Sequence, residues 1–485
     1  MRFLLALIAA SACLCWTGPA AAQQVGQFPF ALTREGQMLG AVEGEVASFK
    51  GMAYAAPPVG PLRFRPPQPT PESSEMRTAY EYGAPCPQPS LSGTSEDCLT
   101  LNVFRPFGVD GPLPVMVFIH GGGFVRGTAN DPLFDGARLA QAGLIVVTVN
   151  YRLGVLGWLG HPALPDGGSG NYGLMDQVAA LHWVHDNIAA FGGDRRNVTL
   201  FGTGAGATSI ALLMLCGEAR ELFQKAILQS VPGRARLRSR PDAEASGLQL
   251  AAMLGQDGAD LRAIAVRRLL AAESKLLAKS PHAFAPSIDG SLVTEDIAAG
   301  FAAGHESRIP LIVGANDDET GFDSEPDIAE ALASSAGATA EQLHPDLARR
   351  PDLAARFYTD KMFSEPVRLL ARLHAASGAP TYRYRFGYVP EARRANPEGG
   401  QGRELQFIFG AEGVPGAGIL SRRDRELASR MRAYWINFAR NGDPNGPELP
   451  RWDAAAGSDR LLLITNDGIA SGDDPLAERL DRLAR

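Results

Sequence analysis

The sequence predicts an α/β fold built on a doubly wound sheet that is mixed but mostly parallel. Two continuous apolar runs, VMVFI at Val115–Ile119 and LIVVTV at Leu144–Val149, are typical of strands buried on both faces. A third run, NVTLF at Asn197–Phe201, leads into a glycine-rich turn and then into a helix-forming run at Ala205–Leu215. Strands and helices that alternate in this way predict a parallel sheet covered by helices.

Other segments extend this alternation. Further strands are expected at Leu99–Phe104, Ala226–Gln229, Ile309–Val313 and Arg460–Ile464, with a short one within residues 49–66. Apolar residues spaced by three and four predict a long helix over Gly173–Phe191, which Gly192 can close, and Ala129–Gln141 is also helix-like. Residues 232–304 and 324–375 are helix-rich and irregular, so we expect them to be insertions over the carboxyl ends of the strands.

The composition is that of an ordinary globular protein and excludes several kinds of partner. The chain has 485 residues, of which 45% are hydrophobic, and a net charge of -7 with acidic and basic residues well mixed. This charge gives no reason to expect a nucleic acid or an anionic membrane as partner. Arginine supplies most of the basic residues and alanine and glycine are abundant, which is typical of a GC-rich bacterial genome.

The amino-terminal residues resemble a secretory signal. Arg2 supplies a positive charge, Phe3–Trp16 an apolar segment and Ala20–Ala22 a small-residue cleavage site. We therefore expect residues 1–22 to be a signal peptide and 23–485 one exported domain, periplasmic or secreted, without a membrane-spanning segment. Lipid attachment at Cys13 is an alternative fate, although the leucine usual in a lipoprotein cleavage site is absent.

The cysteines of the mature chain are consistent with an oxidising compartment. Cys86 and Cys98 flank a loop rich in proline, serine and glycine, and we expect them to form a disulfide. The alternative is two free buried thiols. Cys216 is expected to lie on the apolar helix after the glycine-rich turn and to be in the core.

The glycine-rich turn at Gly202–Ala207 (GTGAGA) has the layout of a nucleophile elbow, G-x-S-x-G, between a strand and a helix. Gly204 stands at the central position. The same residues also fit G-x-G-x-x-G/A, the fingerprint of dinucleotide-binding folds. However, the next strand ends at Gln229 and Ser230, with no acidic residue for a ribose, so dinucleotide binding is the minor alternative.

A second glycine motif, HGGGF at residues 120–124, directly follows the VMVFI strand. Three glycines allow backbone N–H groups to point into one cavity without obstruction by side chains. Two such donors can stabilise an oxyanion, so this loop, together with an elbow downstream, predicts the machinery of acyl transfer.

Taken together, the motifs resemble the type-B carboxylesterase/lipase family, which includes the cholinesterases. The matching segments are SEDCLTLNV at 95–103, HGGGF at 120–124, NYRLG at 150–154, GNYGLMDQ at 170–177, the run from Leu222-Phe223 to Gln229-Ser230, and NGDPNG at 441–446. They span nearly all of the mature chain. The resemblance implies an α/β-hydrolase fold with helical insertions over the carboxyl ends of the strands.

The resemblance also implies roles for individual residues. The oxyanion donors would be the backbone N–H groups of Gly122, Gly123 and Ala205. The acid of a Ser-His-Glu triad would be Glu319 in GANDDET, and Ser230 would be the family's serine beside this acid.

Two triad positions depart from the family pattern. Gly204 stands where the nucleophilic serine is expected, and Gln401 stands where the histidine is expected, three residues before Glu404. Thr203 replaces the usual glutamate before the nucleophile. Glycine has no atom that can attack a carbonyl, and glutamine takes up no proton near neutral pH. In serine hydrolases, loss of the triad costs on the order of 10⁶ in kcat.

The sequence therefore predicts an exported pseudoenzyme of this family that binds a small ester-like ligand or a protein partner. In lacking the serine at this position, the chain also resembles the cholinesterase-like adhesion proteins, which bind partners without hydrolysis. The alternative is an active carboxylic ester hydrolase, or another enzyme that uses the oxyanion hole by a non-standard mechanism. No cofactor or metal is expected, because no zinc, calcium or P-loop motif is present.

Overall fold

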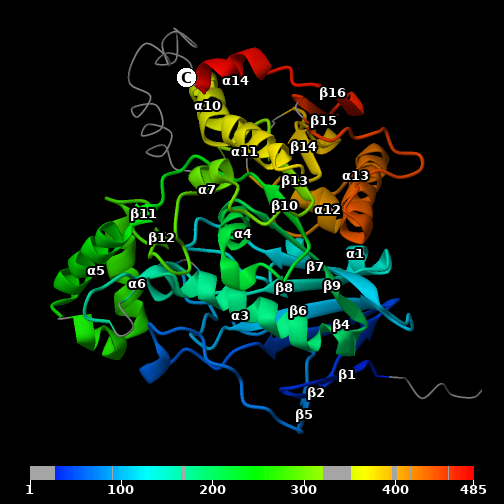
Figure 1. The fold of residues 1–485 in the computed structure, drawn as a ribbon. Coiled ribbons are helices and arrows are strands. Elements are labelled where there is room, and N and C mark those ends of the chain that lie inside the picture. Colours follow the sequence, from blue (N-terminus) through cyan, green and yellow to red (C-terminus); the bar gives the residue numbers. More distant parts are fainter. Residues whose placement is uncertain are drawn as a thin grey trace, which may run out of the picture.

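The fold is known from a computed structural model, drawn as a ribbon in Figure 1. It describes residues 28–89, 91–164, 168, 170–256, 258–320, 351–395, 401–415, 417–456 and 458–484. The predicted signal peptide and Cys13 lie outside the described residues, and so does most of the second predicted insertion.

A sheet of eleven strands forms the centre of the part that the structure describes. Its order is β16-β15-β14-β13-β10-β9-β7-β8-β6-β4-β3. The strands are β3 (Ala41–Glu43), β4 (Val46–Ala53), β6 (Thr100–Pro106), β7 (Leu113–Ile119), β8 (Ile145–Val149), β9 (Gly193–Thr203), β10 (Lys225–Gln229), β13 (Leu311–Asn316), β14 (Thr381–Phe386), β15 (Arg460–Thr465) and β16 (Gly468–Asp473). In this order, all neighbouring strands from β15 through β7 to β8 pair in parallel. The strand β16 at one edge and the strands β6, β4 and β3 at the other edge pair antiparallel with their neighbours. The predicted mixed, mostly parallel sheet is confirmed.

Two small sheets accompany the large one. One contains β1 (Phe30–Thr33), β2 (Gly36–Leu39) and β5 (Met76–Thr78), and the other pairs β11 (Arg238–Ser239) with β12 (Ser287–Ile288). The sequence patterns did not predict these short strands.

Helices cover both faces of the large sheet (Figure 1). They are α1 (Ala137–Gln141), α2 (Gly154–Trp158), α3 (Tyr172–Asn187), α4 (Ala205–Leu215), α5 (Arg240–Leu254), α6 (Val266–Leu277), α7 (Ile297–Ala303), α10 (Pro351–Thr359), α11 (Glu365–Ala376), α12 (Leu405–Phe409), α13 (Arg422–Asn441) and α14 (Ala477–Leu483). Short 3-10 turns lie at Gly60–Leu62, Pro132–Phe134, Ile188–Phe191, Gly217–Ala219, Gly258–Ala263 and Glu391–Arg393, and a π turn at Asp360–Ser364. Helices α3, α4, α7 and α11 contribute to one apolar core, and α1, α12 and α13 to a second. Alternate strand residues supply the two cores, as a doubly wound sheet requires: Val115 and Val117 belong to one, Met116 and Phe118 to the other.

Two of the predicted helices can be compared directly with the structure. The helix predicted over Gly173–Phe191 is α3 followed by a 3-10 turn, and Gly192 closes it with a φ of 80°. The prediction of a helix over Ala129–Gln141 was wrong for the first part of this range, because only α1 at its end is α-helical. Asp131 caps a separate 3-10 turn, and the extended backbone of Asp135 then separates that turn from α1.

The disulfide predicted between Cys86 and Cys98 is present in the structure. Both residues are buried, and the bond closes a loop that ends within the SEDCL segment. Cys216 ends α4 and is buried and free, as expected of a core residue.

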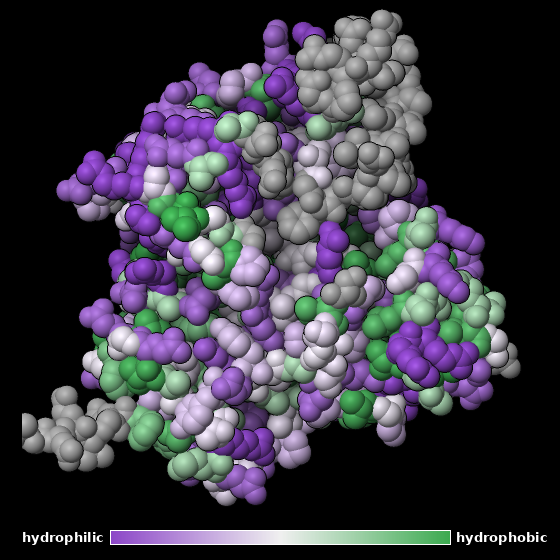
Figure 2. Space-filling model, turned by 180° about the vertical axis from the view of Figure 1, so that it is seen from behind, coloured by the Kyte–Doolittle hydropathy of each residue, from purple (hydrophilic) through white to green (hydrophobic). Residues whose placement is uncertain are grey.

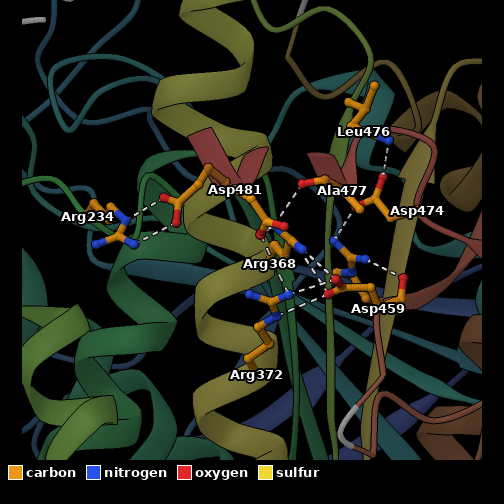
Figure 3. Close-up of polar contacts among 10 residues, drawn as sticks. Arg234, Arg368, Arg372, Asp459, Asp474, Leu476, Ala477 and Asp481 are labelled. Carbon is orange, nitrogen blue, oxygen red and sulfur yellow. Dashed lines mark hydrogen bonds and ion pairs between the residues drawn. The ribbon is translucent and has the colours of Figure 1, made fainter. Parts of the chain in front are cut away.

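An ion-pair cluster holds α14 against α11 (Figure 3). We call this cluster the C-terminal clasp; it consists of Arg368, Arg372, Asp459 and Asp481. The side chain of Arg368 on α11 is only 3% exposed, and it contacts both carboxylates, with its Nη1 2.7 Å from Asp481 Oδ1 and its Nε 3.0 Å from Asp459 Oδ1. Arg372 joins the same Asp459 at 2.7 Å. The clasp thereby fixes the end of the chain to the helical layer.

Polar side chains cover much of the face seen in Figure 2, and apolar side chains gather on the lobe at the right. In that lobe, α5 exposes Leu248 and Met253. No helix within the described ranges is both long and apolar enough to cross a membrane.

Candidate functional site

The glycine turn of the predicted elbow lies between β9, which ends at Thr203, and α4, which begins at Ala205. Gly204 has φ 53° and ψ -115°, a conformation that is strained for any residue with a side chain. Its N–H donates to the carbonyl of Gln229 at 2.9 Å, which fixes the turn against β10. The strand, turn and helix of a nucleophile elbow are therefore present, with glycine at the tip.

The HGGG loop lies beside this turn, because β7 and β9 are neighbouring strands and Ile119 is in register with Gly202. Gly122 and Gly123 have φ values of 110° and 62°. A Cβ on Gly122 would come within 2.8 Å of the carbonyl carbon of Arg126, whereas one on Gly123 would meet open space. The backbone of Gly123 is therefore open on the side where a side chain would project.

His120 anchors the start of this loop. Its Nδ1 lies 2.8 Å from the carbonyl oxygen of Gly121, and its ring stacks on Tyr151 with 4.4 Å between centroids. The Tyr151 hydroxyl donates to the carbonyl of His120 at 2.8 Å. Burial lowers the pKa of His120 to about 4, so the ring is neutral and Nδ1–H donates to the loop.

Glu319 follows the end of β13 and is completely buried. Its Oε1 accepts from the Ser230 hydroxyl at 2.7 Å and from the backbone N–H and side-chain amide of Asn316 at 2.6 and 3.3 Å. Burial, together with the nearby carboxyl of Glu404, raises the pKa of Glu319 to about 8 against the opposing effect of these hydrogen bonds. The carboxyl is therefore largely protonated at neutral pH.

Gln401 places its carboxamide between the glycine turn and Ser230. Its Nε2 lies 3.4 Å from the carbonyl oxygen of Ser230. A Cβ added to Gly204 would lie 2.9 Å from Cδ and 3.2 Å from Nε2 of Gln401, and closer still to its Oε1. The amide therefore occupies the space that a side chain at position 204 would need.

The predicted site residues thus lie together at the carboxyl ends of β7, β9, β10 and β13. The structure adds further residues to this region that the sequence analysis did not assign to the site: His120, Gln229, Asn316 and Glu404. Gln229 Nε2 donates to Glu404 Oε1 at 2.8 Å, and Tyr384 donates to the same oxygen at 3.3 Å. Glu404 was noticed only as a landmark after Gln401, because sequence alone gave no sign that it is buried.

Metal binding finds no support in the described part of the chain, where no group of three or more His, Cys, Asp or Glu side chains could hold an ion. The arrangement can offer backbone N–H donors at the turn and a protonated carboxyl group beneath it.

Comparisons with known proteins agree with the fold described above. The sequence profile of the carboxylesterase family matches residues 27–343 and 333–480. The fumonisin B1 esterase of Sphingopyxis macrogoltabida is 38% identical over 464 residues, which cover 87% of this chain and 83% of that protein. The para-nitrobenzyl esterase of Bacillus subtilis is 36% identical over 481 residues, covering 93% and 97%.

Solved structures match over a similar length. A para-nitrobenzyl esterase structure has a TM-score of 0.83 at 35% identity, and a Geobacillus stearothermophilus carboxylesterase has 0.84 at 33%; each comparison covers 94% of this chain and 99% of the other. The fold and its glycine turn thus define an α/β hydrolase. The chain belongs to the carboxylesterase family.

Proposed function

We propose that this protein is an exported member of the carboxylesterase family that has lost Ser-His-Glu ester hydrolysis and binds an ester-like ligand. In this proposal Gly204 and Gln401 occupy the nucleophile and base positions, while Glu319 is the retained acid. Residues 1–22 are the signal peptide, and 23–485 form a single mature domain.

One observation carries the proposal: the Gln401 carboxamide packs against Gly204. A serine at position 204 and this position of Gln401 cannot coexist, since the serine Cβ would lie 2.9 Å from Gln401 Cδ. The two substitutions therefore fit each other sterically. They replace both groups that would form and break the acyl-enzyme bond.

The remaining parts of the site favour binding over bond cleavage. Gly122, Gly123 and Ala205 present backbone N–H groups suited to a carbonyl oxygen. Gln401 can hydrogen bond to a ligand or a water but is too weak a base to activate it near neutral pH. A protein partner bound at the same surface is the other occupant compatible with this proposal.

The test is turnover of short p-nitrophenyl esters by the purified mature protein, together with labelling by a serine-directed phosphonate. The Bacillus subtilis relative serves as a positive control. We expect no turnover above the buffer rate and no labelled residue in the glycine turn. We also expect saturable binding of a non-hydrolysable ester analogue, either a ketone or the hydrate of a trifluoromethyl ketone. Rapid turnover with a phosphonate adduct would refute the proposal.

A second candidate function is ester hydrolysis by a non-standard route. It is favoured by the retained oxyanion loop and by relatives whose names are those of esterases. Turnover without any phosphonate adduct, abolished when Gln401 is replaced by alanine, would favour this candidate. Membership of the carboxylesterase family already explains the glycine turn at Gly202–Ala207, so the turn gives no separate support to dinucleotide binding.

A further inference from the structure

Large apolar side chains are exposed on the small sheet formed by β1, β2 and β5. Phe28, Phe30, Leu32 and Met76 are each between 48% and 69% exposed. Figure 1 shows this sheet at the lower end of the molecule, where the described chain begins. Apolar side chains that gather in one place on a protein surface commonly mark an interaction site, so this sheet is a candidate for one.

The strand register places these residues on one face of the sheet. Phe30 is paired with Leu39 and Leu32 with Gln37, and Gln37 is paired in turn with Met76. Paired residues of neighbouring strands point to the same side of a sheet, as do alternate residues of one strand. Exposed and buried residues alternate along β1, so the other face of the sheet packs on the protein. We call the outward side the apolar sheet face: Phe28, Phe30, Leu32, Leu39 and Met76.

The charges near this face argue against a second copy of the chain as its partner. Exposed acids outnumber exposed bases in the adjoining segments, with Glu43, Glu45, Glu72 and Glu75 against Arg34 and Arg77. A twofold contact between two copies would bring these acids towards their equivalents, which is unfavourable. The same acids offer no attraction to anionic headgroups. The apolar sheet face itself carries no charge, so it is best matched by an apolar surface without net charge.

The sequence before β1 brings such a surface within reach. The apolar segment Phe3–Trp16 of the predicted signal peptide ends twelve residues before Phe28. Twelve residues of extended chain span at most about 40 Å. While the signal segment is held in a membrane, a tether of this length keeps the apolar sheet face close to the bilayer. The high effective concentration then converts a weak contact into an occupied one.

We propose that the apolar sheet face docks on the zwitterionic surface of a lipid bilayer. Phe28, Phe30 and Leu32 enter the headgroup region, where aromatic and aliphatic side chains are favourable. The contact is confined to the surface and requires no membrane-spanning segment. It takes only the signal peptide from the proposed function, and the presence or absence of ester turnover does not affect it.

The test measures the affinity of the mature chain for phosphatidylcholine vesicles that contain a small share of a nickel-chelating lipid. An amino-terminal histidine tag stands in for the membrane-held signal segment. The face variant combines Phe30→Thr with Leu32→Thr. The matched control combines Leu248→Gln with Met253→Gln on α5, which removes two exposed apolar side chains elsewhere. Because the favourable transfer scales with the apolar area removed from water, we expect the face variant to bind roughly five- to tenfold more weakly, and the control to bind like the parent.

Each outcome decides the proposal. A loss confined to the face variant, and unchanged at high salt, supports it. Equal affinities of parent and face variant would mean that only the tag binds, and an equal loss in the control would indicate general apolar adhesion; either overturns it. A parent dimer in analytical ultracentrifugation that the face variant abolishes would show that a second copy covers the face, which also overturns it. Met76→Thr, on β5, should weaken binding about two- to threefold and repeats the comparison if the double variant does not fold.

Discussion

A side chain at position 204 should be costly, and part of the cost should depend on Gln401. In Gly204→Ala, a φ of 53° costs about 1–2 kcal/mol for a residue with a Cβ. The new Cβ would also lie 2.9 Å from Gln401 Cδ, so the glutamine must leave its position, at a cost of about 0.5–1.5 kcal/mol. We therefore expect Gly204→Ala to lower the free energy of unfolding by about 2–3 kcal/mol.

A double-mutant cycle separates the two contributions. In a Gln401→Ala background the steric part vanishes and only the backbone strain remains, so the loss caused by Gly204→Ala should shrink by about 1 kcal/mol. Urea unfolding followed by circular dichroism measures all four proteins. If the two substitutions were additive to within about 0.3 kcal/mol, the contact between Gln401 and position 204 would carry no energy and the steric reasoning would be refuted.

Three further predictions concern pH, the disulfide and the C-terminal clasp. Glu319 stays protonated in the folded protein up to a pKa of about 8 but ionises near pH 4.5 when unfolded, so its contribution to stability falls as pH rises between these values. Urea midpoints at pH 5, 6.5 and 8 should therefore decline less steeply in Glu319→Gln, and an unchanged slope would contradict this pKa. Replacing Cys86 and Cys98 by serine should cost about 2–3 kcal/mol, so the urea midpoint of the variant should match that of the reduced parent and lie below that of the oxidised parent; a midpoint equal to that of the oxidised parent would contradict this. Arg368→Met should lower the free energy of unfolding by about 1–2 kcal/mol and expose α14 to limited proteolysis. The control Arg422→Met, which removes an exposed ion pair, should change it by under about 0.5 kcal/mol. Equal effects of the two substitutions would show that the C-terminal clasp stabilises the fold no more than an exposed ion pair does.

The central sheet could be predicted because its strands are buried on both faces and so read as continuous apolar runs. The strand β14 could not be predicted in this way, because its sequence TYRYRF alternates with arginine. Arg383 is buried there because two groups far along the chain accept from it, the carboxylate of Asp474 and the carbonyl of Asp459, each at 2.7 Å. A buried ion pair of this kind has no local signal, since either residue alone resembles an exposed charge.

The site could be predicted where function depends on backbone geometry. The glycines of the HGGG loop and of the turn could be recognised in the sequence as site residues, because few other residues allow those backbone conformations and close approaches. The contact between Gln401 and Gly204, and the closeness of the buried carboxyls of Glu319 and Glu404, depend on side chains that meet only after folding. The sequence could therefore indicate which groups are absent but not what occupies their place.

The account is tested most directly by kcat for p-nitrophenyl butyrate, measured on the parent protein and on the variant that combines Gly204→Ser with Gln401→His. Each single variant is the control, because a serine without a base, or a base without a serine, completes no triad. The account predicts no turnover by the parent above the buffer rate, and turnover that appears in the double variant or is far larger there than in either single variant. Appreciable turnover by the parent would contradict it.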